Sequence, residues 1–350
     1  LSSTPGTDGR WVQKPLAFLD AQTGYQRADL GYLTGKAVLH FGSHIETADH
    51  YRRLMAAKPA FLMFADVRYP GTVVTADGMF PAYARDYGAV PTVSVAYLDA
   101  WDFMAAGAKA AGLRVSGGMR DSVSQNVIGE LPGSDPKAGL LVIGAHHDTQ
   151  AGSVGADDNG TGVAALIELA RRLAARPRRK TIRLISFGAE EQLSVGSAVY
   201  VRRHRRELAS RGGIMVNFDS FGSHLGWTIL ECANPRYAAL FAGHLEKQDI
   251  YAKRSDDTCP YCDSFPFAAA GLITVSLGRD NCLAGRFFHH RPDDDLSRVS
   301  CSLVARTAAA MGEGIGALAG KSGWPFPLVV AAPQRRAIAR MWAELYGGWR

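Results

Sequence analysis

The sequence predicts an α/β fold: a mostly parallel central sheet covered by helices on both faces, accompanied by a small α/β domain. Short apolar segments typical of buried strands alternate with amphipathic helical segments through most of the chain. This alternation is typical of parallel sheets covered on both sides. The length of 350 residues exceeds what one ordinary core accommodates, which favours two domains.

The sequence pattern of the first part of the chain predicts an irregular segment followed by a compact domain. Residues 1–33 are rich in Gly, Thr, Ser and Asp, and we expect irregular structure there. Residues 34–118 predict a small α/β domain. Its expected strands are 36–41, 60–64, 90–95 and 113–115, and its expected helices are 49–57 and 99–111.

We expect residues 119–320 to form the larger domain. Residues 321–350 are expected to form an extension with a helix at 337–346. The expected strands of the larger domain are 124–130, 140–144, 181–187, 214–218, 226–232 and 272–277. Its expected helices are 161–174, 195–210 and 300–319. The helix 161–174 places Leu166, Ala170 and Leu173 on one apolar face, as a helix that covers a sheet requires.

Composition excludes several classes of protein. A hydrophobic fraction of 47% with 21% charged residues is typical of a globular chain. The net charge of +6 does not favour a nucleic-acid partner, and the basic run at 171–183 has the spacing of a solvated helix face. The sequence contains no apolar stretch long enough to span a membrane.

Five cysteines, an odd number, do not make a disulfide scaffold. The only close pair is Cys259 and Cys262, in a Cys-Pro-Tyr-Cys segment. A redox motif would need a preceding βαβ unit, and a zinc ribbon would need a second pair, so we favour a local disulfide. The sequence begins at Leu1 and shows no signal-peptide pattern, and the expected disulfide favours a secreted or periplasmic protein.

Acidic and histidine residues recur where the predicted strands end. The clusters are Ala145-His146-His147-Asp148, Asp157-Asp158-Asn-Gly-Thr-Gly162, Glu190-Glu191, Asp219, and His289-His290-Arg-Pro-Asp293-Asp294. Because ligands of open α/β sheets bind outside the carboxyl ends of the strands, these clusters are expected to form one site. Imidazole and carboxylate without thiolate suit zinc, cobalt or manganese, and this many ligands exceed the need of one tetrahedral ion. They fit two metal ions that share a carboxylate.

In their order and spacing, these five motifs resemble peptidase family M28, the co-catalytic zinc aminopeptidases, over residues 126–319. The resemblance implies two zinc ions held by His146, Asp158, Glu191, Asp219 and His290. Asp158 rather than Asp157 would bridge the two ions.

The resemblance also implies the catalytic roles. Glu190 would be the general base for a metal-bridging hydroxide, and Asp148 would orient the ligand His146. Asp294 would support His290, which is favoured over His289. The implied reaction is release of N-terminal residues from peptides with a free N-terminus.

Two further segments resemble parts of such enzymes. The segment from Cys259 to Phe267 is similar to one that lines the family's substrate pocket, which implies Asp263, Ser264 and Phe267 as pocket residues, with His147 as a pocket wall. Residues 35–115 are similar to a protease-associated domain.

Several alternatives stay open at this stage. Within the same fold, the chain could be a dizinc carboxypeptidase or dipeptidase, or a single-zinc cyclase of N-terminal glutamine. A catalytically inactive ectodomain that binds a partner is the alternative outside enzymes, and the presence of every ligand and the base disfavours it. The preferred N-terminal residue cannot be read from the sequence, because loops shape specificity pockets.

Overall fold

The computed structural model describes residues 4–67, 80–117, 121–135 and 137–349. The chain divides into two compact units, Leu1–Ser122 and Val123–Arg350. The predicted domain boundary after residue 118 falls on residues outside the described ranges. Across the described ranges, no helix combines the length and the apolar character that crossing a membrane requires.

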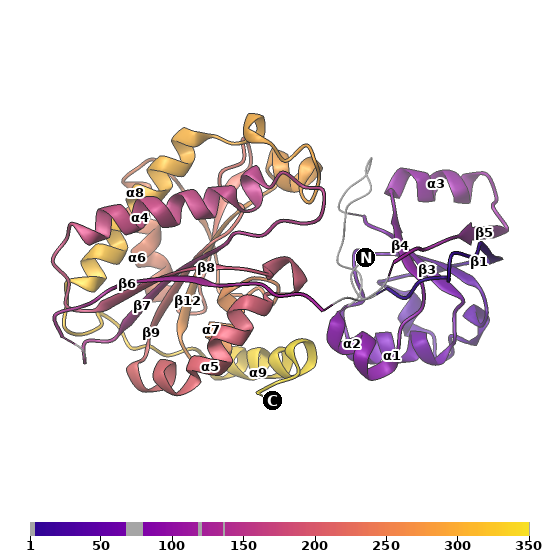
Figure 1. Ribbon diagram of the computed structural model, residues 1–350, viewed down its shortest axis with the longest axis horizontal. Helices are drawn as coiled ribbons and strands as arrows, with labels where there is room; N and C mark the ends of the chain where they lie inside the picture. Colours follow the sequence, from indigo (N-terminus) through magenta and orange to yellow (C-terminus); the bar gives the residue numbers. More distant parts are fainter. Residues whose placement is uncertain (1–3, 68–79, 118–120, 136, 350) are drawn as a thin grey trace. The chain divides into compact units, whose positions relative to one another are not determined.

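The first unit is a five-stranded sheet in the order β4-β3-β2-β1-β5 with helices on both faces (Figure 1). Strands β1 to β4 are parallel, and β5 is antiparallel to β1. Helix α3 covers one face of the sheet, and α1 and α2 cover the other. The elements are β1 (Val12–Asp20), β2 (Ala37–Phe41), α1 (Ala48–Ala56), β3 (Phe61–Ala65), α2 (Pro81–Tyr87), β4 (Thr92–Val95), α3 (Tyr97–Ala105) and β5 (Ala110–Leu113).

The expectation of irregular structure over residues 1–33 is wrong for Val12–Asp20, because this segment is β1 and lies inside the sheet between β2 and β5. The strand has a weak local signal, since it carries Lys14 and Pro15 and buries only Ala17 and Leu19. Long-range pairing to β2 and β5 fixes it instead, including a hydrogen bond from Leu16 N to Lys109 O of 2.9 Å. Pairing with distant residues is not visible in local sequence.

The predicted helix 99–111 is also too long, because α3 ends at Ala105. Gly107 adopts a φ of +65°, and the N–H groups that follow the helix bond back to Phe103 and Met104. A glycine in this conformation is a common helix terminator. The chain then extends into β5, which takes residues that helical periodicity had assigned to the helix.

The second unit is a seven-stranded sheet in the order β11-β10-β12-β9-β7-β8-β6. Its central strands β12, β9, β7 and β8 are parallel, whereas β6 and β10 run antiparallel to their neighbours β8 and β12. The strands are β6 (Val127–Leu131), β7 (Leu140–His146), β8 (Thr181–Phe187), β9 (Gly213–Phe218), β10 (Trp227–Glu231), β11 (Lys253–Ser255) and β12 (Ile273–Asp280). The helices are α4 (Gly162–Ala174), α5 (Val195–Arg211), α6 (Pro235–Glu246), α7 (Ser264–Ala269), α8 (Cys301–Ala319) and α9 (Ala332–Tyr346).

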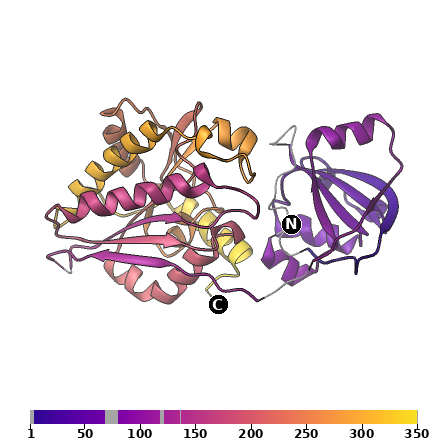
Figure 2. The same cartoon turned by 45° about the horizontal axis from the view of Figure 1, so that its top comes forward.

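Helices cover both faces of this sheet, as predicted (Figure 1). Helices α4, α6 and α8 lie on one face, and both views show α4 beside α8 (Figure 2). Helices α5, α7 and α9 lie on the other face. All seven residues of β7 are buried, which explains why this strand is a continuous apolar run rather than an alternating one.

The C-terminal extension is part of the second unit. The ammonium group of the buried Lys180 donates hydrogen bonds to the carbonyl groups of Lys321 and Gly323 and lies over the ring of Trp324. Helix α9 packs on α7, and the hydroxyl of Tyr346 donates a hydrogen bond of 2.8 Å to Pro260 O. The predicted terminal helix is therefore longer than expected and packs on its own chain.

Replacement of Trp342 by Ala is expected to destabilise the second unit by about 3–5 kcal/mol, the usual cost of removing a buried large aromatic side chain. Trp342 is buried, stacks on Tyr346 and contacts Trp349. Urea denaturation should show a lower midpoint for Trp342→Ala. The control Val329→Ala changes an exposed residue of the same extension and should leave the midpoint unchanged. An unchanged midpoint in Trp342→Ala would mean that α9 is not part of the stable core.

Candidate metal centre

Three adjacent strands bring acidic and histidine residues to one edge of the larger sheet (Figure 1). Strands β9, β7 and β8 are parallel, so their carboxyl ends meet at the same edge. Strand β7 ends at His146, β8 leads into Glu190, and β9 leads into Asp219. His146 is buried whereas His147 is exposed, as expected for neighbours at a strand end that point in opposite directions.

Asp158 lies at the centre of these groups, and its two carboxyl oxygens face different partners. Oδ1 is 3.2 Å from His146 Nε2, which is in turn 3.3 Å from Asp219 Oδ1. Oδ2 is 3.3 Å from His290 Nε2, which is in turn 3.1 Å from Glu191 Oε2. The structure thus brings the five predicted ligands together and places Asp158 between two pairs.

Asp294 holds the turn that carries Asp158. Its carboxylate accepts hydrogen bonds from the backbone N–H groups of Asp157 (3.1 Å) and Asp158 (3.0 Å). Asn159, joined to Asp158 by a cis peptide bond, donates from Nδ2 to Phe218 O at 2.9 Å and so ties the turn to the end of β9. Asp294 was expected to support His290, and its hydrogen bonds to this turn were not anticipated from the sequence.

Asp148 contacts both His146 and the segment that carries the two glutamates. The Nδ1 atom of His146 lies 3.0 Å from the backbone oxygen of Asp148 and 3.7 Å from its carboxylate. The Asp148 carboxylate itself accepts hydrogen bonds from the N–H groups of Glu190 (3.1 Å) and Glu191 (3.2 Å). Asp148 therefore contacts His146 mainly through its carbonyl group, while its carboxylate positions the two glutamates.

Glu190 is buried beside the cluster, with Oε2 at 4.0 Å from His146 Nε2. Burial raises the pKa of this carboxyl well above its usual value, which suits a group that accepts a proton. Ser194, at the start of α5, donates a hydrogen bond of 3.0 Å to Glu190 Oε1. Ser194 belongs to no motif, so sequence reasoning missed it.

The buried carboxylates of this cluster need cations to balance their negative charge. Burial opposes ionisation of His146, but the carboxylates of Asp219 and Asp158 outweigh it and raise its pKa well above the usual value. One oxygen of Glu191, Oε1, is buried without a hydrogen-bond partner. Buried carboxylates are normally paired or bound to metal, because an isolated buried charge is costly.

The donor atoms fit two metal ions. Among the described residues, two groups of potential ligands have donor atoms within 4.8 Å of one another, and both groups include Asp158. One group is His146, Asp158 and Asp219, and the other is Asp158, His289 and His290. Imidazole and carboxylate donors without thiolate are typical of zinc and similar divalent ions.

The second group includes His289, which was not a predicted ligand. His289 Nδ1 lies 3.2 Å from Asp158 Oδ2, and the rings of His289 and His290 stack with centroids 3.6 Å apart. His290 Nε2 also lies 3.1 Å from Glu191 Oε2, and the His290 side chain is 9% exposed against 25% for His289. Adjacent histidines of identical chemistry cannot be told apart by composition, and only the spacing to Pro292 and Asp294 favoured His290.

His290→Ala is expected to weaken metal binding at the position beside Glu191 by more than about 100-fold. Loss of a residue that only supports a ligand lowers metal affinity by about 10–100-fold, and loss of a ligand itself should cost more. His290 is preferred because it contacts both Asp158 and Glu191. His289→Ala is the matched control and should retain both metal ions. Metal content measured after dialysis at graded zinc concentrations distinguishes the two variants. A greater loss in His289→Ala would exchange their roles.

The predicted pocket residues are largely buried. Asp263 and Phe267 have no exposed surface, and Ser264 is 1% exposed. Phe267 packs against Phe187 and Tyr200 in the core under α5, so it does not line an open pocket. Burial raises the pKa of Asp263 to about 7. These three residues are buried because α7 begins at Ser264 and packs its first turn inward, whereas His147 is exposed. A pocket role for Asp263, Ser264 and His147 stays a prediction.

The predicted disulfide between Cys259 and Cys262 is not formed, and both cysteines are free thiols. The buried Cys262 Sγ lies 3.4 Å from the backbone oxygen of Cys259 and 3.2 Å from Ser264 Oγ. The two thiols interact in the tight turn before α7, but no bond joins the sulfurs.

Comparison with known proteins identifies the family. The sequence profile of peptidase family M28 matches residues 126–315, which is more than half of the chain. The chain belongs to peptidase family M28.

Curated relatives agree with this membership, and a solved structure shares the fold. Aminopeptidase YwaD of Bacillus subtilis is 28% identical over 197 residues, covering 51% of this chain and 41% of the relative. Carboxypeptidase Q of Xenopus laevis is 28% identical over 226 residues, covering 61% of this chain and 47% of the relative. The structure of BSAP, a zinc aminopeptidase from Bacillus subtilis, superposes with a TM-score of 0.71 and 21% identity, covering 91% of this chain and 78% of that one. The matched region thus spans less than half the length of these two curated relatives.

Proposed function

We propose that this chain is a two-zinc aminopeptidase that releases N-terminal residues from peptides. The observation that carries the proposal is the position of Asp158, whose two carboxyl oxygens each face a separate His–carboxylate pair. A shared carboxylate between two ligand groups is the arrangement that a two-metal hydrolytic site requires.

The ligand set of the proposal follows from these contacts. One zinc ion would be held by His146, Asp158 and Asp219, and the second by Asp158, Glu191 and His290. When bound, the zinc ions would acidify a water molecule and polarise the scissile carbonyl group.

The remaining work falls to residues of the chain. Glu190 accepts the proton of the attacking water and returns it to the leaving amine, because its buried carboxyl lies beside the ligand His146. Ser194 fixes the orientation of Glu190 through one carboxyl oxygen. Asp148 holds the backbone of both glutamates, so it positions the base relative to the ligands.

Free-amine recognition is also part of the proposal. Two carboxylates of the proposed metal centre, the base Glu190 and the ligand Asp219, offer negative charge to an α-ammonium group. The first unit is proposed to be a protease-associated-like module, on the basis of its strand and helix order. A secreted or periplasmic location remains a prediction, which cell fractionation with an antibody to the chain tests.

The test combines metal content with activity on a short peptide panel in free-amine and N-acetylated forms. We expect two zinc ions per chain, cleavage of the free-amine peptides alone, loss of activity with a chelator and recovery with zinc. Cleavage of N-acetylated peptides from the carboxyl end would indicate a carboxypeptidase instead. One metal ion with cyclisation of N-terminal glutamine would indicate a cyclase. Absence of both metal and turnover would leave a partner-binding protein.

A further inference from the structure

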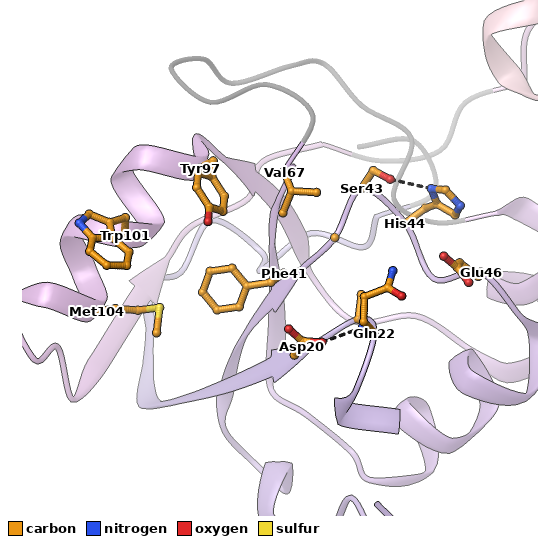
Figure 3. A pocket seen from close by; sticks show the side chains of 12 residues that line it. Asp20, Gln22, Phe41, Ser43, His44, Glu46, Val67, Tyr97, Trp101 and Met104 are labelled. Carbon is orange, nitrogen blue, oxygen red and sulfur yellow. Dashed lines mark hydrogen bonds between the residues drawn. The ribbon is translucent and has the colours of Figure 1, made fainter. Parts of the chain in front are cut away.

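The first unit contains a cavity of about 390 Å³ (Figure 3), whereas the residues of the metal centre belong to the second unit. It opens at the carboxyl ends of β1 and β2 and is bordered by α3. This volume falls within the range of about 300–1,000 Å³ that is typical of ligand pockets. The described residues that line it all belong to the first unit.

One end of the cavity is apolar. Tyr97, Trp101 and Met104 recur at the spacing that places residues on one face of α3, and Phe41 lies opposite them at the end of β2 (Figure 3). The side chains of Trp101 and Met104 are 59% and 42% exposed, so they do not belong to the buried core. Large apolar side chains that gather in a concave, exposed site mark a binding surface.

The other end is acidic. Asp20, at the end of β1, and Glu46, before α1, line it, and none of the described residues that line the cavity is Lys or Arg. The N–H groups of Thr23 (2.8 Å) and Gln22 (2.7 Å) donate hydrogen bonds to Asp20 Oδ1 and hold the pKa of this carboxyl below its usual value. The cavity therefore presents negative charge next to an aromatic wall at neutral pH.

We propose that this cavity binds a peptide segment in which a large apolar side chain is followed by a lysine or arginine. The apolar side chain would lie against Phe41, Tyr97 and Met104, and the cation would reach the carboxylates of Asp20 and Glu46. The face of Trp101 can also attract a cation. Charge complementarity favours a cationic partner, because an acidic peptide would place its carboxylates next to those of Asp20 and Glu46.

The proposal does not depend on the peptidase activity. Its test uses the full chain and acetyl-Phe-Lys-amide, which is blocked at both ends and has no free N-terminus for an aminopeptidase. Isothermal titration calorimetry should detect binding, with affinity that falls as salt is added, because exposed charge pairs are screened. Acetyl-Phe-Glu-amide should bind at least about tenfold more weakly.

Variants of the chain locate the site. Trp101→Ala and Glu46→Gln should each lower the affinity for acetyl-Phe-Lys-amide by about tenfold. Both residues are exposed, so the variants are expected to fold, and circular dichroism verifies this. Leu98→Ala and Asp99→Asn change exposed residues of α3 that do not line the cavity, and both should bind like the wild type.

Three results would overturn the proposal. The first is no binding of acetyl-Phe-Lys-amide, and the second is equal affinity for the lysine and glutamate peptides. The third is unchanged affinity in both Trp101→Ala and Glu46→Gln, which would place any bound peptide elsewhere, including at the metal centre. Hydrolysis measured in parallel separates the two ideas, because Trp101→Ala should keep the proposed aminopeptidase activity.

Discussion

Glu190→Gln is expected to lower peptide hydrolysis by about 10²–10⁴-fold, the usual contribution of a positioned general base, while leaving metal binding intact. The reason is the placement of the Glu190 carboxyl, which is buried beside the cluster, with Oε2 at 4.0 Å from Nε2 of the predicted ligand His146. The amide keeps the size of the side chain and can still accept the hydrogen bond from Ser194. It cannot accept a proton at neutral pH.

Metal content and turnover are measured on the same preparation of Glu190→Gln. Glu246→Gln is the control, because it changes an exposed glutamate at the end of α6. The control should match the wild type in both measurements. Loss of metal in Glu190→Gln would make Glu190 a ligand, and full activity in that variant would remove it from the role of base.

Much of the second unit could be predicted because its signals are local. Buried parallel strands such as β7 are continuous apolar runs, and the acidic motifs follow the strands directly. The carboxyl ends of neighbouring parallel strands must share an edge, so residues such as His146 and Asp219 could be expected to meet.

The features that were missed depend on contacts between distant residues. Strand β1 is stabilised by partners in β2 and β5, and its own sequence resembles a loop. Ser194 reaches Glu190 only because α5 begins where it does, and the inward turn of α7 buries Phe267. The two thiols at Cys259 and Cys262 have the spacing of a local disulfide and interact in the turn, yet they remain unbonded. None of these outcomes has a signature within a few residues of sequence.

Asp158→Asn is expected to reduce metal content from two zinc ions per chain to one or none and to abolish hydrolysis. Asp158 is the single residue that both candidate ligand groups share, so its change affects both positions at once. An asparagine offers one neutral carbonyl oxygen in place of two charged ones. It therefore cannot complete both ligand groups or offset the positive charge of two ions.

The neighbouring aspartate provides a control of the same chemistry. Asp157 is also buried, and burial raises its pKa to about 7, but its carboxylate accepts a hydrogen bond of 2.8 Å from Gly222 N rather than facing the histidines. Asp157→Asn keeps that acceptor oxygen and should retain two zinc ions. Metal content and thermal unfolding with and without zinc are measured for both variants. Zinc should stabilise the Asp157 variant as it does the wild type, because a ligand that binds only the folded state raises its stability. If instead Asp157→Asn loses the metal and Asp158→Asn keeps it, the bridging carboxylate is Asp157 and the ligand set built around Asp158 is wrong.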